Sequence, residues 1–397
     1  MPLSLSERAG LIEPSATLAM GAEARKLKAQ GFEILDFALG EPDFDTPNNI
    51  QEAAIRAIRD GKTHYTPPAG IPELRQAIAR LYTDHHGVAT EAAQVVVSNG
   101  AKHAIHNALM AVCGPGDEVI IPAPYWVSYS DLVKLTGAKP VVIPTSEASG
   151  FKMTPEQFQN AVTPRSKLLM INSPSNPTGV VYERSELAAL AQAVLKTDVG
   201  VLSDEIYEQL TYGDAQPTCF ASLDPALPAR TITISGVSKS YAMTGWRIGW
   251  SIAPTAVSKF IGDLQSQETS NPCSVSQWAA LEAINGPQET VAEMKAEFAK
   301  RRRYVLERIE RLPGVTCAAP GGAFYAFMNV SSYFGKTLGG KKITDSTSFC
   351  MAALSAANVA LVMGSAFGAE GYARMSFATD LKTLEKGFDA LERFLAS

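Results

Sequence analysis

The stretch Thr231-Ile-Thr-Ile-Ser-Gly-Val-Ser-Lys239, continued by Ser240-Tyr-Ala-Met-Thr-Gly-Trp-Arg247, places a lysine after a short apolar run. Such a run is typical of a buried strand, and open α/β sheets bind ligands at the carboxyl ends of their strands. Burial disfavours the ammonium form, so the pKa of this lysine should fall and its nucleophilic amine become available. An amine of this kind condenses with aldehydes, which indicates pyridoxal phosphate as cofactor, with Arg247 near its phosphate. The alternative is an ordinary surface lysine in a loop.

The pattern around this stretch, from about residue 90 to 255, alternates short apolar runs with helical stretches. We expect a helix over residues 101–112 and strands over residues 95–98, 118–121, 141–143, 167–172, 199–203, 230–234 and 246–252. This alternation predicts an α/β fold with a mostly parallel sheet covered by helices. Polar residues follow four of the strands, namely Asn99-Gly100, Ser173 to Thr178, Asp204 with Tyr207, and Lys239. We therefore expect a single site at this edge of the sheet.

Composition narrows the class of protein. The 397 residues are 46% hydrophobic and 19% charged, with a formal net charge of −5, which argues against nucleic acid and anionic membranes as partners. Charged residues interrupt the first 20 positions, and no apolar stretch reaches the roughly 20 residues of a membrane span, so we expect neither a secretory signal nor a membrane segment. Five widely spaced cysteines predict reduced thiols and a cytoplasmic protein. His103 and His106 share a helix face but lack an acidic or thiol partner nearby in sequence, which disfavours a metal site.

The character of the chain changes after about residue 255. A long charged helix is expected over residues 291–312, followed by a helix over 347–357 and a strand over 373–378. We predict an N-terminal arm with part of a small domain in residues 1–45, a large cofactor-binding domain in residues 46–290, and a small C-terminal α+β domain in residues 291–397.

Pyridoxal chemistry needs more than a lysine, and the chain offers candidates for each further part. Gly100-Ala101-Lys102, where a strand meets a helix, offers N–H groups for the phosphate. Asp204 is placed to keep the pyridine nitrogen protonated, although a helix cap or turn is its alternative role. Tyr207 and Asn176 suit the phenolic oxygen, and Trp126 can cover the ring.

Three motifs carry a family resemblance: Ser173-Pro-Ser-Asn-Pro-Thr-Gly179, Ser203-Asp-Glu-Ile-Tyr207, and Ser238-Lys239 through Arg247. In order and spacing they resemble class I pyridoxal-phosphate aminotransferases of fold type I. The match runs from Glu41-Pro42 to Arg374 and is closest to the bacterial aspartate aminotransferases, some of which accept prephenate. It implies a large domain with a mostly parallel seven-stranded sheet, a smaller α+β domain, and ping-pong transamination through pyridoxamine phosphate.

The resemblance also implies roles for individual residues. Lys239 would bind the cofactor covalently and then move the proton at the substrate's Cα. Asp204 would pair with the pyridinium, and Asn176 and Tyr207 with the phenolate oxygen. The phosphate would be held by Gly100, Ala101, Lys102, Ser238 and Arg247, with Tyr65 reaching over from a second subunit, so the resemblance implies a homodimer.

The resemblance also implies a substrate site. Arg374 would bind the substrate's α-carboxylate, with Gly40, Asn176 and Trp126 completing the site. The alternative for Arg374 is a strand-edge arginine in a salt bridge.

Substrate choice depends on residues far from the lysine. In the resembling subgroup, a lysine at the position of Lys102 and hydroxyls at those of Ser15 and Thr17 bind the distal carboxylate; a helix cap is the alternative for both hydroxyls. We therefore expect L-aspartate with 2-oxoglutarate, or alternatively aromatic amino acids, alanine or prephenate. Glu13 stands where good prephenate users tend to have a basic residue, so we expect weak or no prephenate activity.

Two other classes of protein, a hydrolase and a pyridoxal-binding regulator, fit the sequence less well, and one residue differs from the family pattern. Gly236-Val-Ser-Lys-Ser240 matches the G-x-S-x-G motif of hydrolases at every position except the last, where Ser240 replaces glycine, and all histidines precede Ser238, which argues against a hydrolase. A pyridoxal-binding regulator would need a DNA-binding domain, yet only about 40 residues precede Glu41. The departure is Gly236, where many members of the family have a serine that donates to the phosphate; Ser235 or backbone N–H groups are the expected substitutes.

Overall fold

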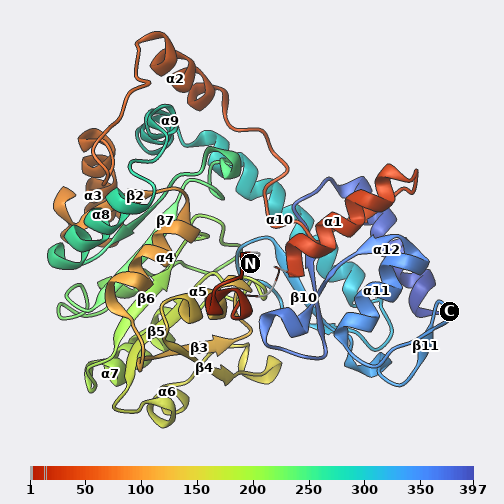
Figure 1. The fold of residues 1–397 in the computed structure, drawn as a ribbon. Coiled ribbons are helices and arrows are strands. Elements are labelled where there is room, and N and C mark those ends of the chain that lie inside the picture. The colour runs from red at the N-terminus through yellow and green to blue at the C-terminus, as the bar shows by residue number, and fades with distance from the viewer. Residues whose placement is uncertain (1–2, 13, 15) are drawn as a thin grey trace.

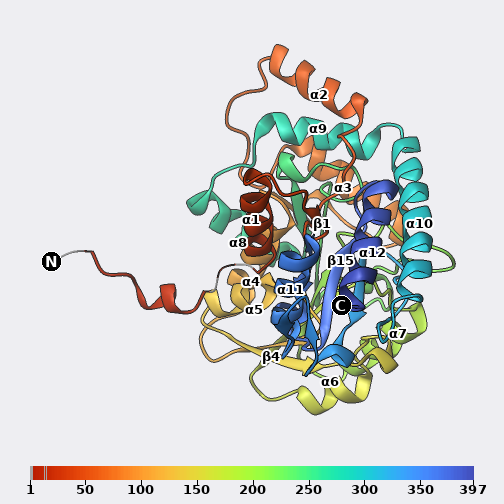
Figure 2. The ribbon, with the colours of Figure 1, turned by 90° about the vertical axis from the view of Figure 1, so that its right-hand side faces the viewer.

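The computed structural model describes residues 3–12, 14 and 16–397. Figure 1 shows the chain gathered around two sheets, with the strands of the larger one on the left and the C-terminal elements on the right. The first described residues, 3–12, extend away from the rest of the molecule (Figure 2).

The larger sheet has seven strands in the order β2-β8-β7-β6-β5-β3-β4. All neighbours pair in parallel except β8, which is antiparallel to both β2 and β7. The predicted mostly parallel α/β sheet is therefore confirmed. The strands are β2 Val95–Ser98, β3 Glu118–Ala123, β4 Lys139–Pro144, β5 Ser166–Asn172, β6 Gly200–Asp204, β7 Thr231–Gly236 and β8 Gly249–Ile252. The strand expected from residue 246 begins later, because Thr244–Trp246 form a 3-10 helix.

Helices cover both faces of this sheet because alternate side chains of its strands point to opposite sides. Val95 and Val97 pack with residues of α3 and α9, whereas Val96 packs with α4. All four residues of β2 are buried. The surrounding helices are α2 Asn48–Arg59, α3 Pro72–His86, α4 Ala101–Val112, α5 Ser128–Leu135, α6 Pro155–Ala161, α7 Arg184–Leu195, α8 Thr255–Glu268 and α9 Ser274–Asn285.

The smaller sheet has the order β14-β15-β10-β9, with antiparallel pairing throughout. Its strands are β9 Thr316–Cys317, β10 Tyr325–Asn329, β14 Val362–Met363 and β15 Tyr372–Ser376. The helices of this part are α1 Ala16–Ala29, α10 Glu289–Ile309, α11 Ser346–Ala357 and α12 Leu381–Leu395, and the short pairs are β1 Leu35–Asp36 with β13 Val359–Ala360, and β11 Thr337–Leu338 with β12 Lys341–Lys342.

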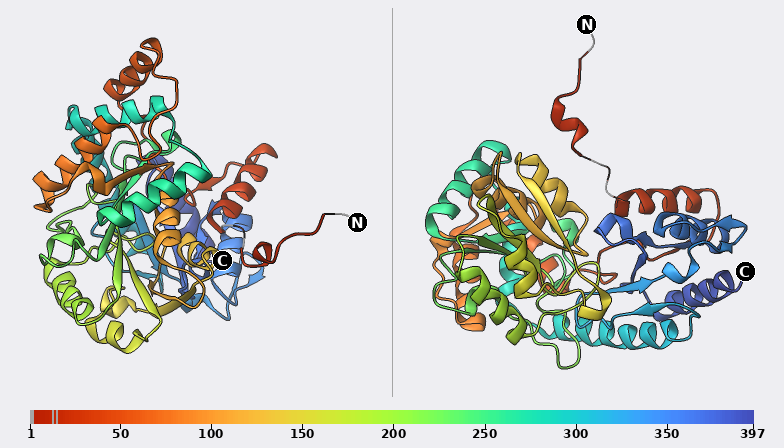
Figure 3. Two further views of the ribbon diagram at one scale, coloured as in Figure 1. Left: turned by 60° about the vertical axis from the view of Figure 1, so that its left-hand side comes forward. Right: turned by 90° about the horizontal axis from the view of Figure 1, so that it is seen from below.

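The N-terminal elements belong spatially with the C-terminal ones. β1 pairs with β13, and α1 lies against the C-terminal elements, as Figure 3 shows from below. This arrangement supports the proposed division into residues 1–45, 46–290 and 291–397, which we retain as a proposal. Among the helices of the described residues, none combines the length and apolar character that a bilayer span requires.

Candidate active site

Lys239 follows β7 by three residues and lines a cavity of about 410 Å³ between the two sheets. Its Nζ donates a 2.6 Å hydrogen bond to the carbonyl oxygen of Gly40. Burial lowers the pKa of Lys239 to about 8, against the opposing charge of Glu41. The neutral amine required of a nucleophile is thus accessible near neutral pH.

Gly236 is explained by packing at the end of β7. A Cβ atom there would lie 2.8 Å from Cα of Gly249 and 2.9 Å from the carbonyl oxygen of Ile248. A serine at this position would therefore clash with the backbone of β8 and the residue before it. Ser235 does not replace it as a phosphate ligand, because its Oγ is buried and donates to Oε1 of Glu208 at 3.3 Å.

Asp204 ends β6 and is buried in the same cavity. Its Oδ2 accepts a 2.5 Å hydrogen bond from Tyr129 Oη, and its Oδ1 accepts one from the backbone N–H of Ile206 at 3.2 Å. Burial raises the pKa of Asp204 to about 6, and the hydrogen bond from Tyr129 acts against this rise. A buried carboxyl group with a free side toward the cavity suits a partner cation such as a pyridinium.

The turn between β2 and α4, called the cradle turn below, has features that suit an anion. Gly100 caps α4 with φ of +87°, and a Cβ there would lie 2.5 Å from Nη2 of Arg247. Arg247 itself is fixed by hydrogen bonds from Nη1 to the carbonyl oxygen of Thr244 at 2.7 Å and from Nη2 to that of Asn99 at 3.4 Å. The N–H groups at the start of a helix have no partner within it, so this turn offers donors and a cation together.

Arg374 on β15 is 1% exposed, and among the side chains that the structure describes it pairs with no carboxylate. It donates from Nη1 to Asn176 Oδ1 at 2.9 Å and from Nη2 to the carbonyl oxygen of Ala38 at 2.7 Å. Its Nε lacks a hydrogen-bond partner, and its guanidinium lies 4.6 Å from the centre of the Tyr325 ring. The salt bridge considered as its alternative role is therefore absent, and a buried cation with an unused donor suits a carboxylate ligand.

The cavity gathers most of the residues that the sequence indicated. Those lining it are Thr17, Gly40, Ala101, Lys102, Trp126, Asn176, Asp204, Tyr207, Ser238, Lys239, Arg247 and Arg374. Lys102 Nζ lies 4.9 Å from the centre of the Trp126 ring, and burial, helped by the charge of Arg247, lowers the pKa of Lys102. Tyr65 lies outside this lining with a side chain that is 91% exposed, and Ser15 and Glu13 fall outside the described residues.

Sequence reasoning missed three residues of this site. Tyr325 of β10 lies 2.9 Å from Tyr207, hydroxyl to hydroxyl, and Tyr129 holds Asp204. For Tyr325 and Tyr129, the sequence offered no motif or spacing that indicated a place in the site. Arg25 lines the cavity from α1, and it stands eight residues after Thr17, on the same helix face. That spacing could have found it.

These features fit pyridoxal phosphate: a lysine with a lowered pKa, a buried carboxyl group, a glycine cradle beside Arg247, and an unpaired buried arginine. They define the site of a pyridoxal-phosphate enzyme that acts on carboxylate substrates. The chain belongs to the class I and II aminotransferases, whose family model matches residues 33–391. Its substrates are accordingly amino acids and 2-oxo acids.

Full-length relatives agree with this assignment. An aspartate/prephenate aminotransferase of Cereibacter sphaeroides is 47% identical over 394 residues, which cover 99% of this chain and 98% of the relative. An aspartate aminotransferase of Geobacillus stearothermophilus is 45% identical over 393 residues, 99% of each chain. The crystal structure of the aspartate aminotransferase from Rhizobium meliloti superposes with a TM-score of 0.96 at 40% identity, covering 100% of this chain and 99% of that one.

Proposed function

We propose that the protein transfers the amino group of L-aspartate to 2-oxoglutarate in two half-reactions, giving oxaloacetate and L-glutamate. The observation that carries this proposal is the cavity that holds Lys239, Asp204 and Arg374 together. The relatives named above as aspartate aminotransferases support the choice of aspartate.

When bound, pyridoxal phosphate supplies an aldehyde that condenses with amines and a ring that withdraws electrons from the substrate's Cα. Lys239 Nζ would hold the cofactor and take the proton from Cα, which its lowered pKa favours. The Asp204 carboxylate would keep a proton on the ring nitrogen, and Tyr207 and Asn176 would donate to the phenolic oxygen. The backbone at Gly100 and Ala101, with Lys102, Ser238 and Arg247, would hold the phosphate, and Trp126 would cover the ring.

Substrate binding would use the two ends of the cavity. Arg374 would take the α-carboxylate, with Gly40 and Asn176 beside it. A second carboxylate would meet Lys102, Thr17 and Arg25. Apart from Lys239, which would hold the cofactor, the charged residues that line the cavity favour a dianion, because four are cations and two are anions: Arg25, Lys102, Arg247 and Arg374 against Glu41 and Asp204.

We further propose a homodimer in the cytoplasm. The exposed ring of Tyr65 supports the homodimer, since a tyrosine that is 91% exposed is free to reach a neighbouring chain. Free thiols support the cytoplasm, because all five cysteines are unpaired.

The test of the proposed function follows the cofactor's absorbance during half-reactions with single amino donors. The wild-type holoenzyme should be converted by L-aspartate and L-glutamate at rates well above those for L-alanine and L-phenylalanine. Lys239→Ala should fold, lose the absorbance band of the covalently held cofactor, and show no turnover. Appreciable turnover by Lys239→Ala would refute the catalytic assignment, and a preference for aromatic donors would refute the choice of aspartate.

Prephenate requires a separate measurement, because the relatives include aspartate/prephenate aminotransferases. The negative charge of Glu13, in a part of the chain outside the described residues, is the reason to expect weak activity. Glu13→Lys should raise prephenate turnover relative to that of oxaloacetate. A wild-type enzyme that uses both acceptors equally well would contradict the prediction.

A further inference from the structure

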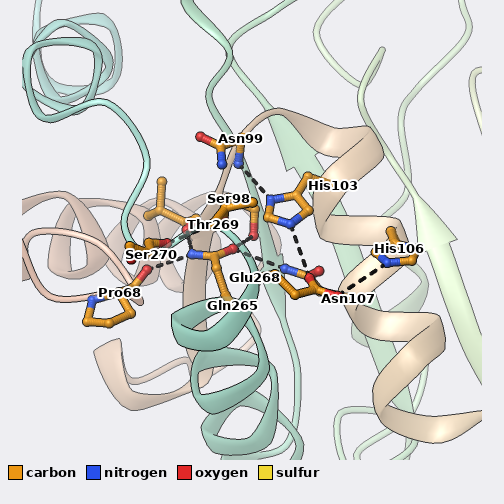
Figure 4. Close-up of polar contacts among 11 residues, drawn as sticks. Pro68, Ser98, Asn99, His103, His106, Asn107, Gln265, Glu268, Thr269 and Ser270 are labelled. Carbon is orange, nitrogen blue, oxygen red and sulfur yellow. Dashed lines mark hydrogen bonds and ion pairs between the residues drawn. The ribbon is translucent and has the colours of Figure 1, made fainter.

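Figure 4 shows side chains of α4 and α8 in polar contact with the cradle turn and with each other; Gln265, His103 and Glu268 among them do not line the cavity. Gln265 of α8 is fully buried and uses its whole amide: Oε1 accepts from Ser98 Oγ at 2.6 Å and Asn107 Nδ2 at 3.0 Å, while Nε2 donates to the carbonyl oxygens of Pro68 and Val97 at 2.6 and 2.8 Å. The end of β2 and the body of α4 are thereby fixed to α8. The residues between them, Asn99 and Gly100, are not held by Gln265.

His103 holds this remaining part of the turn. The backbone N–H of Asn99 donates to Nδ1 of His103 at 3.3 Å. His103 is the third residue of α4, so this contact resembles a capping box, in which the third side chain of a helix reaches back to a backbone N–H before it. On its other side, the carbonyl oxygen of Asn99 accepts from Arg247. One peptide segment is therefore fixed by His103 and by the expected phosphate ligand Arg247.

The contact specifies the state of the imidazole ring. A backbone N–H can only donate, so Nδ1 of His103 must carry a lone pair, and the ring is neutral with its proton on Nε2. That Nε2 faces Oε2 of Glu268, 3.6 Å away. A second proton would occupy Nδ1 and set two donors against each other at the Asn99 N–H.

The groups around His103 determine the pH at which its ring gains the second proton. Burial lowers the pKa of His103, Glu268 from α8 acts to raise it, and His106 on the same helix lowers it. His106 Nε2 lies 3.6 Å from the other oxygen of Glu268. On the other side of the turn, the guanidinium of Arg247 donates to the carbonyl oxygen of Asn99, and Lys102 precedes His103 in α4. The ring therefore stays neutral through neutral pH and gains its second proton only on acidification.

We propose that His103 is a positioning residue that keeps the Asn99–Gly100 turn in its phosphate-binding shape only while its ring is neutral, so that acidification loosens the cofactor. The proposal rests on the proposed function, because it takes this turn as the phosphate site. It gives the histidine a role through the turn, without contact to the cofactor.

Three variants of His103 separate its two ring nitrogens. In His103→Asn, the amide oxygen takes the place of Nδ1 and accepts from Asn99 at every pH. His103→Gln keeps a polar atom near Glu268 but not the acceptor at Nδ1, and His103→Leu removes both. The measurement is the dissociation constant of pyridoxal phosphate from each holoenzyme, obtained by ultrafiltration and absorbance between about pH 5 and 8, the range in which histidines titrate.

Wild type and His103→Asn should bind equally at the alkaline end, and wild type should bind about threefold to tenfold more weakly at the acidic end, the effect of one lost hydrogen bond. His103→Leu and His103→Gln should show that weakening throughout. Protonation of the cofactor's phosphate affects all variants alike and cancels in the comparison. His106→Gln is the matched control: residue 106 lies on the same helix beside Glu268 but does not touch the turn, so its profile should retain the acidic loss, at slightly higher pH because His106 lowers the pKa of His103.

The same pH dependence in wild type and His103→Asn would overturn the proposal. A second variant leaves α4 unchanged in case His103→Asn does not fold: Glu268→Gln removes the charge that favours the protonated ring, so the acidic loss should move to lower pH. An unmoved profile in Glu268→Gln would equally overturn it. Failure of the wild-type enzyme to hold the cofactor at Lys239 would instead refute the proposed function.

Discussion

At Asp204, burial and hydrogen bonding act in opposite directions on one carboxyl group. Burial raises its pKa to about 6, whereas the hydrogen bond from Tyr129 favours the charged form. A raised carboxyl pKa means that the folded protein binds this proton more tightly than the unfolded chain does, so the group costs stability as pH rises from about 4 to 6. A cation beside the carboxylate would offset that cost, which is how a pyridinium would be bound here.

Tyr129→Phe tests this balance. A hydrogen bond to a charged group is worth about 1.5–3 kcal/mol, so its loss should raise the pKa of Asp204 further and lower turnover roughly tenfold near neutral pH. The acidic limb of the profile of kcat/KM against pH should move to higher pH. Tyr125→Phe is the control, because the Tyr125 hydroxyl has no hydrogen bond to Asp204. An unchanged acidic limb in Tyr129→Phe would show that Tyr129 does not support the charge of Asp204.

Arg25 lines the cavity and, in the proposed function, would meet the distal carboxylate of aspartate. Its side chain is exposed at the cavity wall, where a charge contributes about 0.2–1 kcal/mol. Arg25→Gln should lower kcat/KM for aspartate about twofold to fivefold, with less effect in high salt, and leave that for alanine unchanged. Lys26→Gln, which removes an exposed partner of Glu23 on the same helix, should change neither. Equal losses for aspartate and alanine would exclude a role in binding the distal carboxylate.

At the level of elements, periodicity predicts the large sheet well because its strands are short, buried and separated by clear turn signals. The helix expected over residues 101–112 is α4 itself, and β2 has the expected bounds. Sequence could not predict that β8 runs antiparallel, since an apolar run has no direction. Nor could it explain Gly236, whose reason is a close approach of β7 to a strand that follows 13 residues later.

Gly236→Ser tests that explanation. The contacts of its Cβ would be with backbone atoms, which cannot rotate away, so we expect a loss of about 1–3 kcal/mol in the free energy of unfolding. The measurement is denaturant unfolding of the two proteins at equal concentration. Gly245→Ser, where a Cβ would meet nothing within 4 Å, should lie within about 0.5 kcal/mol of wild type. A fully stable Gly236→Ser would show that β7 and β8 can separate at no cost.

At the level of the whole molecule, the site is built from segments far apart in the sequence, and the periodicity of the sequence does not predict that they meet. Arg374 of the small sheet lies within hydrogen-bond distance of the carbonyl of Ala38 from the N-terminal part and of Asn176 from the loop after β5 of the large sheet. The family motifs indicated Asn176 and Arg374, because resemblance carries spatial information that periodicity lacks. Tyr325 and Tyr129 were missed because a tyrosine in a buried strand or helix looks like core until its hydroxyl partner is seen.

Within a single chain, Tyr65 is exposed and does not line the cavity. It lies in the segment held by Gln265 and Gln277, which bind Pro68 and Thr66, so the loop is fixed while the ring points to solvent. A rigid loop with an exposed tyrosine is suited to completing the site of a second copy related by twofold symmetry. For the proposed homodimer, this relation predicts that each subunit supplies its Tyr65 to the proposed phosphate site of the other.

Mixed dimers of Lys239→Ala and Tyr65→Ala chains, purified through two different tags, decide whether that exchange occurs. If Tyr65 acts on the partner, one site of the mixed dimer combines an intact Lys239 with the intact Tyr65 of the other chain, while the second site carries both defects. Turnover at limiting cofactor should then exceed that of either variant alone, and the competent sites should bind cofactor with wild-type affinity. If Tyr65 acts within its own chain, every site with Lys239 lacks Tyr65, and the mixed dimer should bind cofactor no better than Tyr65→Ala does. Size-exclusion chromatography with light scattering provides the control, because a monomeric wild-type protein would rule out the exchange altogether.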